Sequence, residues 1–216
     1  EVEINCLEKK EKELNRRFYK NQKKKLPYII LKWAQTEDGF IAKQDGNSRW
    51  ISNETSRMLV HKWRAEEPGI LIGVNTANLD NPNLTVRSWN GKNPTRIVLD
   101  PNNKLKNDAF LLRDSHSTLI FNKLIEKKIK NKLYIKIYPF NLKMILSDLY
   151  KKGVSSILVE GGASTLNHFI KDNLWDEARI FISKTKFKNG ILASKIKLKK
   201  GNIIENDTLY IIRNYA

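Results

Sequence analysis

Short apolar runs alternate with helical patterns along most of the chain, and this alternation constrains the fold more than any other feature. The four clearest runs are Tyr28–Ala34, Gly69–Gly73, Arg96–Leu99 and Ser156–Glu160. They are too short for typical helices and rich in β-forming residues, which indicates buried strands. Strands separated by helices usually form a mostly parallel sheet that is covered on both faces. We therefore predict an α/β fold with three layers, in which helices flank the central sheet.

The remaining elements extend this prediction. Helices are predicted at residues 53–67, 141–152 and 164–171, and further strands at Ser117–Phe121 and Leu133–Tyr138. Asn53 is a plausible N-cap, and Pro68 ends that helix. The stretch from Glu177 to Tyr215 is rich in β-forming residues, so we expect antiparallel strands at one edge of the sheet. The sheet is therefore expected to be mixed.

The N-terminal stretch differs in character from the rest of the chain. Residues 5–25 are strongly charged, with Leu7, Leu14 and Phe18 near helical spacing, and Pro27 stops the pattern. We predict a helical arm over residues 1–25 and one domain over residues 26–216.

The composition of the 216 residues is that of a soluble globular protein, with 40% hydrophobic and 29% charged residues. No apolar run approaches the roughly 18 residues of a membrane span, and no apolar signal segment comes after Glu1. The lone Cys6 excludes an internal disulfide framework and a cysteine-rich zinc site. We expect a cytoplasmic protein with no bound metal and no membrane partner.

The formal net charge of +17 leaves two interpretations open. Clustered basic residues can bind the phosphate backbone of a nucleic acid. Here, however, the excess is mostly lysine, spread over the chain in runs such as Lys23–Lys25 and Lys195–Lys200. A solvated, lysine-rich surface explains this pattern better, so we expect no nucleic-acid partner. A basic nucleic-acid-binding module stays as the alternative.

The sharpest candidate site is the segment from Val159 to Thr165, where a strand runs into Gly161-Gly162 and a helix opens at once. Adjacent glycines let a phosphate approach the backbone, and the first turn of a helix offers unpaired N–H groups. Glu160, at the strand end, can bond ring nitrogens or move a proton. The alternatives are a tight strand-to-helix turn with Ser164 as an ordinary cap, and a Glu160 that points to water.

Two more constellations are rich in polar side chains. Thr76 and Asp80 come after the strand that ends at Gly73, and Arg87 closes the same loop with a side chain suited to phosphate. Arg57, His61 and Arg64 share one face of the helix at 53–67, where a basic stripe can bind a phosphate or be a solvated surface. His116 and His168 are isolated in sequence, so a metal site or a histidine-activated nucleophile has no support.

Taken together, five segments resemble one family from about residue 28 to about residue 185. They are Lys32-x-Ala34-x-Thr36-x-Asp38-Gly39-x-x-Ala42, Ser48-x-Trp50-Ile51, His61-x-x-Arg64-Ala65, Gly73-x-x-Thr76-x-x-x-Asp80-Asn81-Pro82-x-Leu84-Thr85-x-Arg87 and Glu160-Gly161-Gly162. The family is the reductase domain of the bacterial bifunctional riboflavin-biosynthesis deaminase/reductase, which is similar in fold to dihydrofolate reductase. Thr36 stands where this family usually has Ser.

The resemblance implies that NADPH reduces 5-amino-6-(5-phosphoribosylamino)uracil to the ribitylamino product, with hydride going to the sugar C1′. Positions that resemble the family's NADPH contacts are Ala34, Trp50, Thr76, Asp80, Pro101, Gly162, Ala163, Ser164, Thr165, Leu166, Asn167 and His168. Those that match its substrate contacts are Ser48, Arg64, Leu84, Arg87 and Glu160, with the arginines as the natural phosphate holders. Lys32 and Glu160 are the hypothesised catalytic pair for acid/base work and orientation.

The resemblance also carries expectations about partners. The full family protein begins with a zinc deaminase domain whose His-x-Glu and Pro-Cys-x-x-Cys motifs are absent from this sequence. Residues 1–20 resemble the segment that links that domain to the reductase, so we expect a deaminase that is fused or separate, and a homodimer. The alternatives are a related reductase that acts on another pyrimidine or a pteridine, and a remnant that only binds a partner.

Overall fold

The computed structural model describes residues 8–46 and 51–215. Ser48 and Trp50 lie outside the described residues. The helices are α1 (Glu8–Leu14), α2 (Arg16–Lys24), α3 (Glu54–Glu66), α4 (Val74–Asp80), α5 (Phe110–Arg113), α6 (Leu142–Lys151) and α7 (Ala163–Lys171). The strands are β1 (Tyr28–Thr36), β2 (Phe40–Ala42), β3 (Gly69–Gly73), β4 (Thr95–Leu99), β5 (Thr118–Asn122), β6 (Lys127–Ile129), β7 (Lys132–Lys136), β8 (Ser156–Val159), β9 (Glu177–Ser183), β10 (Ile191–Leu192), β11 (Asn202–Ile204) and β12 (Asp207–Arg213).

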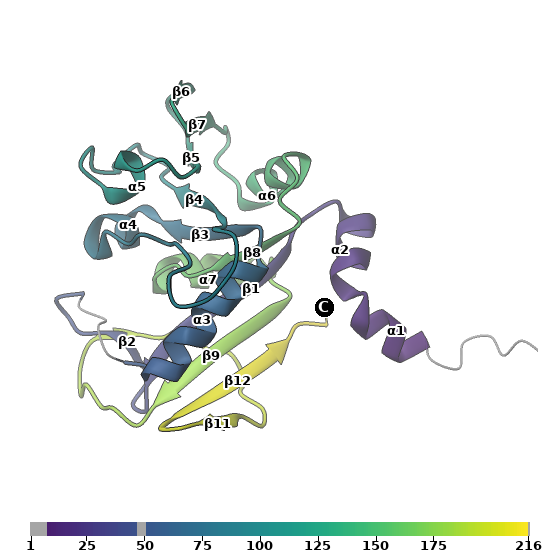
Figure 1. Cartoon of the computed structure of the whole chain (residues 1–216), viewed down its shortest axis with the longest axis vertical. Helices are drawn as coiled ribbons and strands as arrows, with labels where there is room; N and C mark the ends of the chain where they lie inside the picture. Colours follow the sequence, from purple (N-terminus) through teal and green to yellow (C-terminus); the bar gives the residue numbers. More distant parts are fainter. Residues whose placement is uncertain (1–7, 47–50, 216) are drawn as a thin grey trace, which may run out of the picture.

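The centre of the domain is one large mixed sheet (Figure 1). Within the described ranges it has ten strands, in the order β11-β12-β9-β1-β8-β3-β4-β5-β7-β6. The seven strands from β9 to β7 in this order run parallel to one another, whereas β12, β11 and β6 join antiparallel. The predicted mostly parallel, mixed sheet is therefore confirmed. Strand β8 lies between β1 and β3, although it comes more than eighty residues after them in the sequence.

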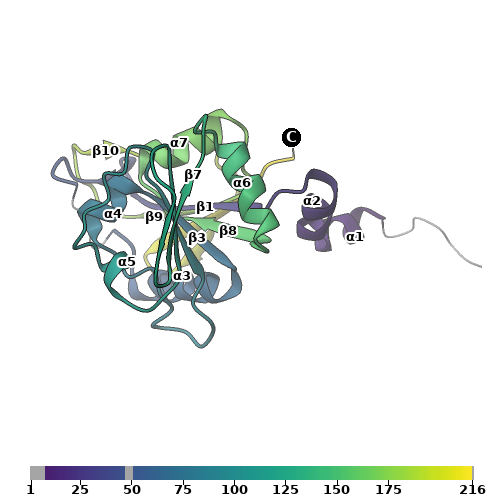
Figure 2. The ribbon, with the colours of Figure 1, turned by 90° about the horizontal axis from the view of Figure 1, so that it is seen from above.

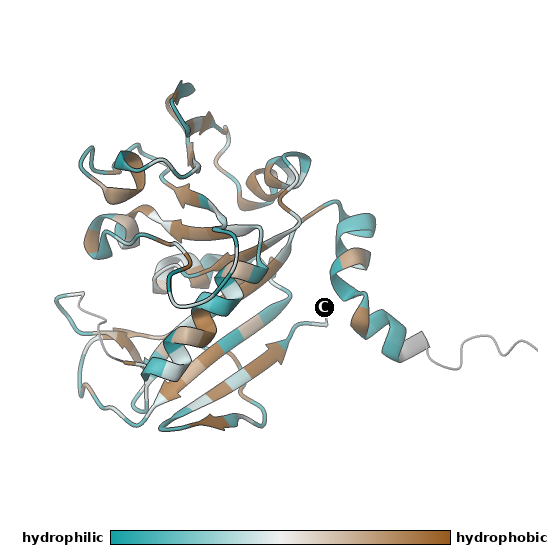
Figure 3. Ribbon diagram, in the orientation of Figure 1, coloured by the Kyte–Doolittle hydropathy of each residue, from teal (hydrophilic) through white to brown (hydrophobic). Residues whose placement is uncertain are grey.

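Helices cover both faces of this sheet, as Figure 2 shows from above. On one face, α6 and α7 bury Leu146 and Phe169 against alternate residues of the strands. On the other face, α3 packs Val60 and Trp63 over β1, β8 and β9, and α4 and α5 cover β3 to β5. The colouring in Figure 3 shows this division, because the strands are mostly apolar whereas the outer faces of the helices are mostly polar. The prediction of three layers is confirmed.

Several elements differ from the sequence-based expectation. The antiparallel strands at the β12 edge are confirmed, but β6 adds a further one at the opposite edge. All three β6 residues are exposed, so no apolar alternation marks this strand in the sequence. The predicted helical arm contains two helices, which are separated at Asn15. The first part of the loop expected between Gly73 and Arg87 is helix α4. Strand β2 pairs with β10 in a separate small sheet.

Helix α3 begins where the sequence predicts, and polar bonds fix its position on the sheet. The Asn53 side chain accepts a hydrogen bond from Ser56 N at 2.7 Å, which is the expected N-cap. The buried Asp207 of β12 accepts from Asn53 N at 2.9 Å and from the Ser56 hydroxyl at 2.6 Å. These bonds tie the start of α3 to β12 and so help to set the direction of the helix over the sheet.

The arm lies outside the three layers, at the end of the sheet where the parallel strands begin (Figures 1 and 2). Ion pairs nevertheless attach α2 to the domain. Arg17 donates two hydrogen bonds to Glu67, at 3.0 and 2.8 Å, and Lys20 bonds Asp176 at 2.7 Å. The Glu67 side chain is fully buried and also accepts from the Ser156 hydroxyl. The Arg17–Glu67 ion pair thus holds α2 against a buried carboxylate at the end of α3.

We expect Arg17→Ala to lower the free energy of unfolding by about 2 kcal/mol, because it leaves the buried Glu67 without its charged partner. Urea denaturation measures the change. Lys10→Ala, an exposed lysine of α1, is the control and should shift the stability by less than about 0.5 kcal/mol. Equal stability of the Arg17 variant and this control would mean that the arm does not support the domain.

Candidate active site

The carboxyl ends of β1, β8 and β3 meet at one cleft. The register pairs Val159 of β8 with Leu31 of β1 on one side and with Leu71 of β3 on the other. Lys32 is the next residue of β1 and Glu160 directly follows the end of β8, so the two residues lie side by side. An open cavity of about 700 Å³ lies above them, with walls from β1, α3, α4 and the start of α7. Open α/β sheets bind their ligands in crevices outside the carboxyl ends of the strands, which is where this cavity lies.

Three charged side chains form the floor of the cleft. Arg64 of α3 binds Glu160 with two hydrogen bonds, from Nε to Oε1 at 2.8 Å and from Nη2 to Oε2 at 2.9 Å. The Lys32 Nζ lies 3.8 Å from Glu160 Oε2. Lys32 is 15% exposed, Arg64 12% and Glu160 10%, so this cluster is largely removed from water. Glu160 does not point to solvent, which was the alternative left open by the sequence.

The cluster changes the acid strength of its members. Burial opposes the charge of Glu160, but Arg64 and Lys32 outweigh it and lower the pKa of this carboxyl to about 2. Burial lowers the pKa of the Lys32 ammonium, and Arg64 adds to the effect while Glu160 works against it. Glu160 is therefore a permanent carboxylate at neutral pH, whereas Lys32 gives up its proton more readily than an exposed lysine does.

The glycines beside the cluster form a cradle in the backbone. Gly162 N donates to the Thr76 hydroxyl at 3.0 Å, which ties the start of α7 to α4. A Cβ on Gly162 would lie 3.1 Å from that hydroxyl, and one on Gly161 would lie 2.6 Å from the Thr165 Cβ. Gly162 is itself the N-cap of α7, so it offers no side chain to the N–H groups of the first turn. The turn with Ser164 as cap, the other interpretation of this segment, is not what forms.

These features fit an extended ligand that carries phosphate. The first turn of the nine-residue helix α7 presents N–H groups and a partial positive charge toward the cleft. Gly161 and Gly162 keep the backbone there accessible, and any side chain at Gly162 would narrow the opening. Residues of α4, Thr76 and Asp80, line the adjoining wall. A dinucleotide cofactor would be held by these three segments.

The third wall is the helix α3 with the loop above it. Arg57, His61 and Arg64 all face the cavity, so the predicted basic stripe is turned toward the site. The His61 Nδ1 accepts from Arg87 N at 3.2 Å, and Arg64 Nη1 donates to Thr85 O at 3.3 Å. Burial, Arg64 and Arg87 lower the pKa of His61, which is therefore neutral at pH 7. Within the described part of the chain, the exposed Arg87 guanidinium makes no hydrogen bond or ion pair.

The structure brings most of the predicted site residues to this cavity. Lining it are Lys32, Ala34, Arg64, Thr76, Asp80, Arg87, Glu160, Gly162, Ala163 and Ser164. Predicted residues that do not line it are Leu84, Pro101, Thr165, Leu166, Asn167 and His168. Leu84 and Leu166 are buried in hydrophobic clusters, so their side chains serve the core.

Larger apolar side chains complete the cavity, and the four named here were not among the predicted site residues. Trp33 comes from β1, Ile41 from β2 and Leu79 from α4. Ile191 of β10 joins them because β10 pairs with β2. Only the pairing of two strands distant in sequence brings Ile191 here, and no local pattern predicts it. A mixed polar and apolar lining is typical of small-molecule sites.

A metal centre and a membrane-spanning helix are both missing from the described residues. No group of three or more His, Cys, Asp or Glu side chains within residues 8–46 and 51–215 is placed to hold a metal ion. None of the helices in those ranges combines the length and the apolar character that a membrane crossing requires.

Comparisons with known protein families and curated proteins agree on one group. The family model described as "RibD C-terminal domain" matches residues 27–185. The chain is 38% identical over 190 residues to the riboflavin biosynthesis protein RibD of Aquifex aeolicus, covering 85% of this chain and 53% of that protein. It is 32% identical over 173 residues to the 2,5-diamino-6-ribosylamino-4(3H)-pyrimidinone 5′-phosphate reductase of Archaeoglobus fulgidus. That match covers 72% of this chain and 79% of the archaeal protein. The chain spans about half the length of the RibD proteins it matches.

Solved structures support the same grouping. The deaminase/5-amino-6-(5-phosphoribosylamino)uracil reductase of Thermotoga maritima superimposes with a TM-score of 0.85 at 29% identity, covering 96% of this chain and 62% of that one. Dihydrofolate reductase of Enterococcus faecalis shares the fold, with a TM-score of 0.55 at 15% identity over 87% of this chain and 96% of that one. The dihydrofolate-reductase-like architecture is thereby confirmed.

Proposed function

The chain belongs to the RibD C-terminal domain family, and from this premise we propose that it is an NADPH-dependent reductase of riboflavin biosynthesis. Its substrate is 5-amino-6-(5-phosphoribosylamino)uracil and its product is the 5-phosphoribitylamino compound. The observation that carries the proposal is the buried Lys32–Glu160–Arg64 cluster at the foot of a cleft with a glycine cradle on one side. The cluster offers a proton donor and a fixed carboxylate, and the cradle offers room for a cofactor.

The reduction needs one hydride and one proton. NADPH, when bound, supplies the hydride for the sugar C1′. The ribosylamine opens to an imine between C1′ and its nitrogen, and reduction of that double bond places a proton on the nitrogen. Lys32 is the group that supplies this proton, because it lies in the cleft and its pKa is lowered by burial. Glu160 stays charged beside it and holds the ammonium in place.

Substrate recognition divides between two arginines. Arg64 uses three of its N–H groups on Glu160 and Thr85 O, so it orients the carboxylate and the loop. Arg87 lines the same cavity and stays exposed, which leaves it as the residue for the substrate's phosphate. Glu160 can accept hydrogen bonds from the pyrimidine. A related reductase whose pyrimidine or pteridine substrate carries no phosphate would not need a free arginine at this position.

Several features of the whole protein are proposed from the family. RibD of Aquifex aeolicus is about twice as long as the matched region. We propose that residues 1–25 are a linker segment and residues 26–216 the reductase domain. Its deaminase partner is fused to it or separate, and the protein is a cytoplasmic homodimer.

Cofactor binding is tested by energy transfer from tryptophan to nicotinamide, for which Trp33 in the cleft wall is a suitable donor. We expect saturable binding of NADPH, weaker binding of NADH and no competition by duplex DNA. Gly162→Val should abolish the signal, because its side chain meets Thr76 and narrows the mouth of the cradle. Asp80→Ala should weaken it.

The opposite outcomes are equally clear. Gly162→Val with wild-type affinity would remove the glycine pair from the cofactor site. Binding of DNA in a salt-sensitive way, without NADPH binding, would overturn the reductase and favour the nucleic-acid module that the net charge of +17 left open.

A further inference from the structure

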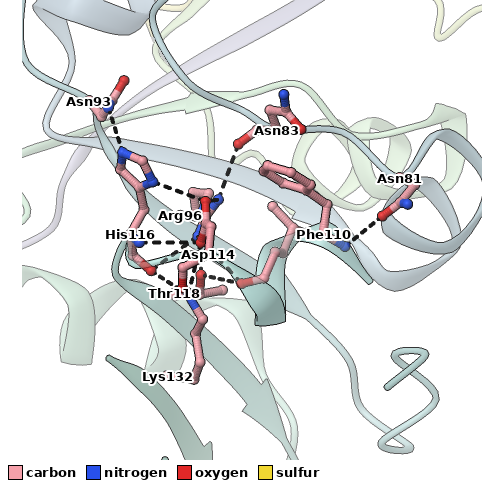
Figure 4. Close-up of polar contacts among 10 residues, drawn as sticks. Asn81, Asn83, Asn93, Arg96, Phe110, Asp114, His116, Thr118 and Lys132 are labelled. Carbon is pink, nitrogen blue, oxygen red and sulfur yellow. Dashed lines mark hydrogen bonds and ion pairs between the residues drawn. The ribbon is translucent and has the colours of Figure 1, made fainter. Parts of the chain in front are cut away.

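A second ionic cluster lies at the start of β4, β5 and β7, and Figure 4 shows its polar contacts. At its centre, Arg96 is fully buried and forms a double ion pair with Asp114 through both terminal nitrogens. Lys132 adds a bond to Asp114 Oδ1 at 3.1 Å, and Thr118 accepts from Arg96 Nε at 3.2 Å. The reductase chemistry proposed above uses none of these residues.

The cluster reaches the loop between α4 and β4 at two points. Arg96 Nη1 donates to Asn83 O at 3.2 Å, as the dashed line in Figure 4 marks. At the other end of the loop, His116 bonds Asp114 Oδ2 through Nδ1 at 2.9 Å and Asn93 Nδ2 through Nε2 at 2.8 Å. Asn93 in turn accepts from Val86 N at 2.7 Å through Oδ1. The ionic cluster therefore holds the loop on both sides of residue 84.

The hydrogen-bond roles in this chain are fixed by one another. Val86 N can only donate, so the Asn93 oxygen faces it and the Asn93 amide nitrogen faces His116. The His116 Nε2 must then accept, which places its hydrogen on Nδ1, where the Asp114 carboxylate accepts it. Asp114 thus selects the tautomer of His116, and His116 selects the orientation of Asn93.

The backbone between these bonds is held in an unfavourable conformation. Leu84 has φ 55°, in the left-handed region that branched side chains rarely adopt, and its side chain is buried. Such a residue persists only where its surroundings enforce it. Next to it, Thr85 O and Arg87 N are bonded by Arg64 and His61 of the cleft. Segment 83–87 is thus fixed between the ionic cluster on one side and α3 on the other.

We propose that Asp114, His116 and Asn93 are positioning residues of the reductase, which hold segment 83–87 so that the Arg87 guanidinium faces the cleft and binds the substrate's phosphate. The inference rests on the proposed function and adds the means by which its phosphate-binding residue is placed. Asn93 is its outermost member and is exposed, so it can be replaced without opening the core.

The test compares wild type with Asn93→Ala, Arg87→Ala and the double variant, using NADPH and 5-amino-6-(5-phosphoribosylamino)uracil. For Asn93→Ala we expect KM for this substrate to rise about tenfold, because Val86 N loses its acceptor and His116 loses its partner. The values of kcat and of the KM for NADPH should stay unchanged within about twofold. The double variant should have the same KM as Arg87→Ala, because Asn93 acts only through Arg87. With a substrate that lacks the 5′-phosphate, wild type and Asn93→Ala should be equal.

A control and two contrary outcomes complete the design. Asn107→Ala, an exposed asparagine in the turn before α5, should behave as wild type. If the wild type is active and KM is unchanged in Asn93→Ala, this inference is overturned while the proposed function stands. The same holds if the double variant shows the KM increases of both single variants combined. An inactive wild type overturns the proposed function and this inference with it.

Discussion

Lys32→Met should reduce kcat by about a thousandfold while leaving NADPH affinity unchanged within about twofold. Methionine has nearly the volume of lysine but carries no proton. The fold should survive, because Glu160 keeps its two hydrogen bonds to Arg64 when Lys32 is replaced. Steady-state turnover and the tryptophan-to-nicotinamide signal separate chemistry from binding.

The pH profile gives the Lys32 prediction a second readout. Burial lowers the pKa of the Lys32 ammonium below its ordinary value of 10.5. Lys32 therefore loses its proton at a lower pH than an exposed lysine does. As the pH is raised, wild-type kcat should therefore begin to fall at a pH below 10.5. The residual activity of Lys32→Met should show no such fall. Lys184→Met, at an exposed lysine after β9, is the matched control and should keep full activity. A Lys32 variant with wild-type kcat would remove this residue from the mechanism.

Glu160→Gln is expected to have the largest effect on stability, a loss of about 3 kcal/mol at pH 7. The amide keeps the shape of the side chain but leaves Arg64 and Lys32 without their counter-charge, at exposures of only 12% and 15%. Turnover should also fall by more than about a hundredfold, because the proton donor and the pyrimidine both lose their partner. Urea denaturation and steady-state kinetics measure the two effects.

The pH dependence of the Glu160 effect has a definite sign. The folded-state pKa is lowered from 4.5 to about 2, so the stabilisation is complete above 4.5 and is lost as the pH falls toward 2. The difference between wild type and Glu160→Gln should therefore shrink across this window. Glu66→Gln removes an exposed partner of Lys62 on the same helix as Arg64, and should cost less than about 0.5 kcal/mol. A Glu160 variant as stable as this control would mean that the cluster does not support the fold.

Much of this architecture could be predicted because the strands are marked by local pattern. Apolar runs indicated the central strands, and Asn53 indicated the start of α3, because both signals lie within a few residues of sequence. The crowding of polar residues after strand ends pointed to the cleft, since the ends of parallel strands share one edge. The family resemblance then named individual positions that local pattern could not.

What could not be predicted depends on which distant segments meet. Arg96 is the second residue of β4 and would be expected to reach solvent, yet it is fully buried, with Asp114 and Thr118 as hydrogen-bond partners beside it. Arg64 was expected to hold a phosphate, but the fold turns it toward Glu160, from which it is separated by almost a hundred residues. The edge strand β6 has no buried face to reveal it.

The most direct test of the proposed function is NADPH oxidation by the purified chain, measured by nicotinamide absorbance with and without 5-amino-6-(5-phosphoribosylamino)uracil, with mass spectrometry of the product. We expect oxidation that requires the substrate, forms one equivalent of the 5-phosphoribitylamino compound and is lost in Lys32→Met. NADPH that binds but is not oxidised in the presence of this substrate would contradict the assignment and direct the search to another pyrimidine or a pteridine.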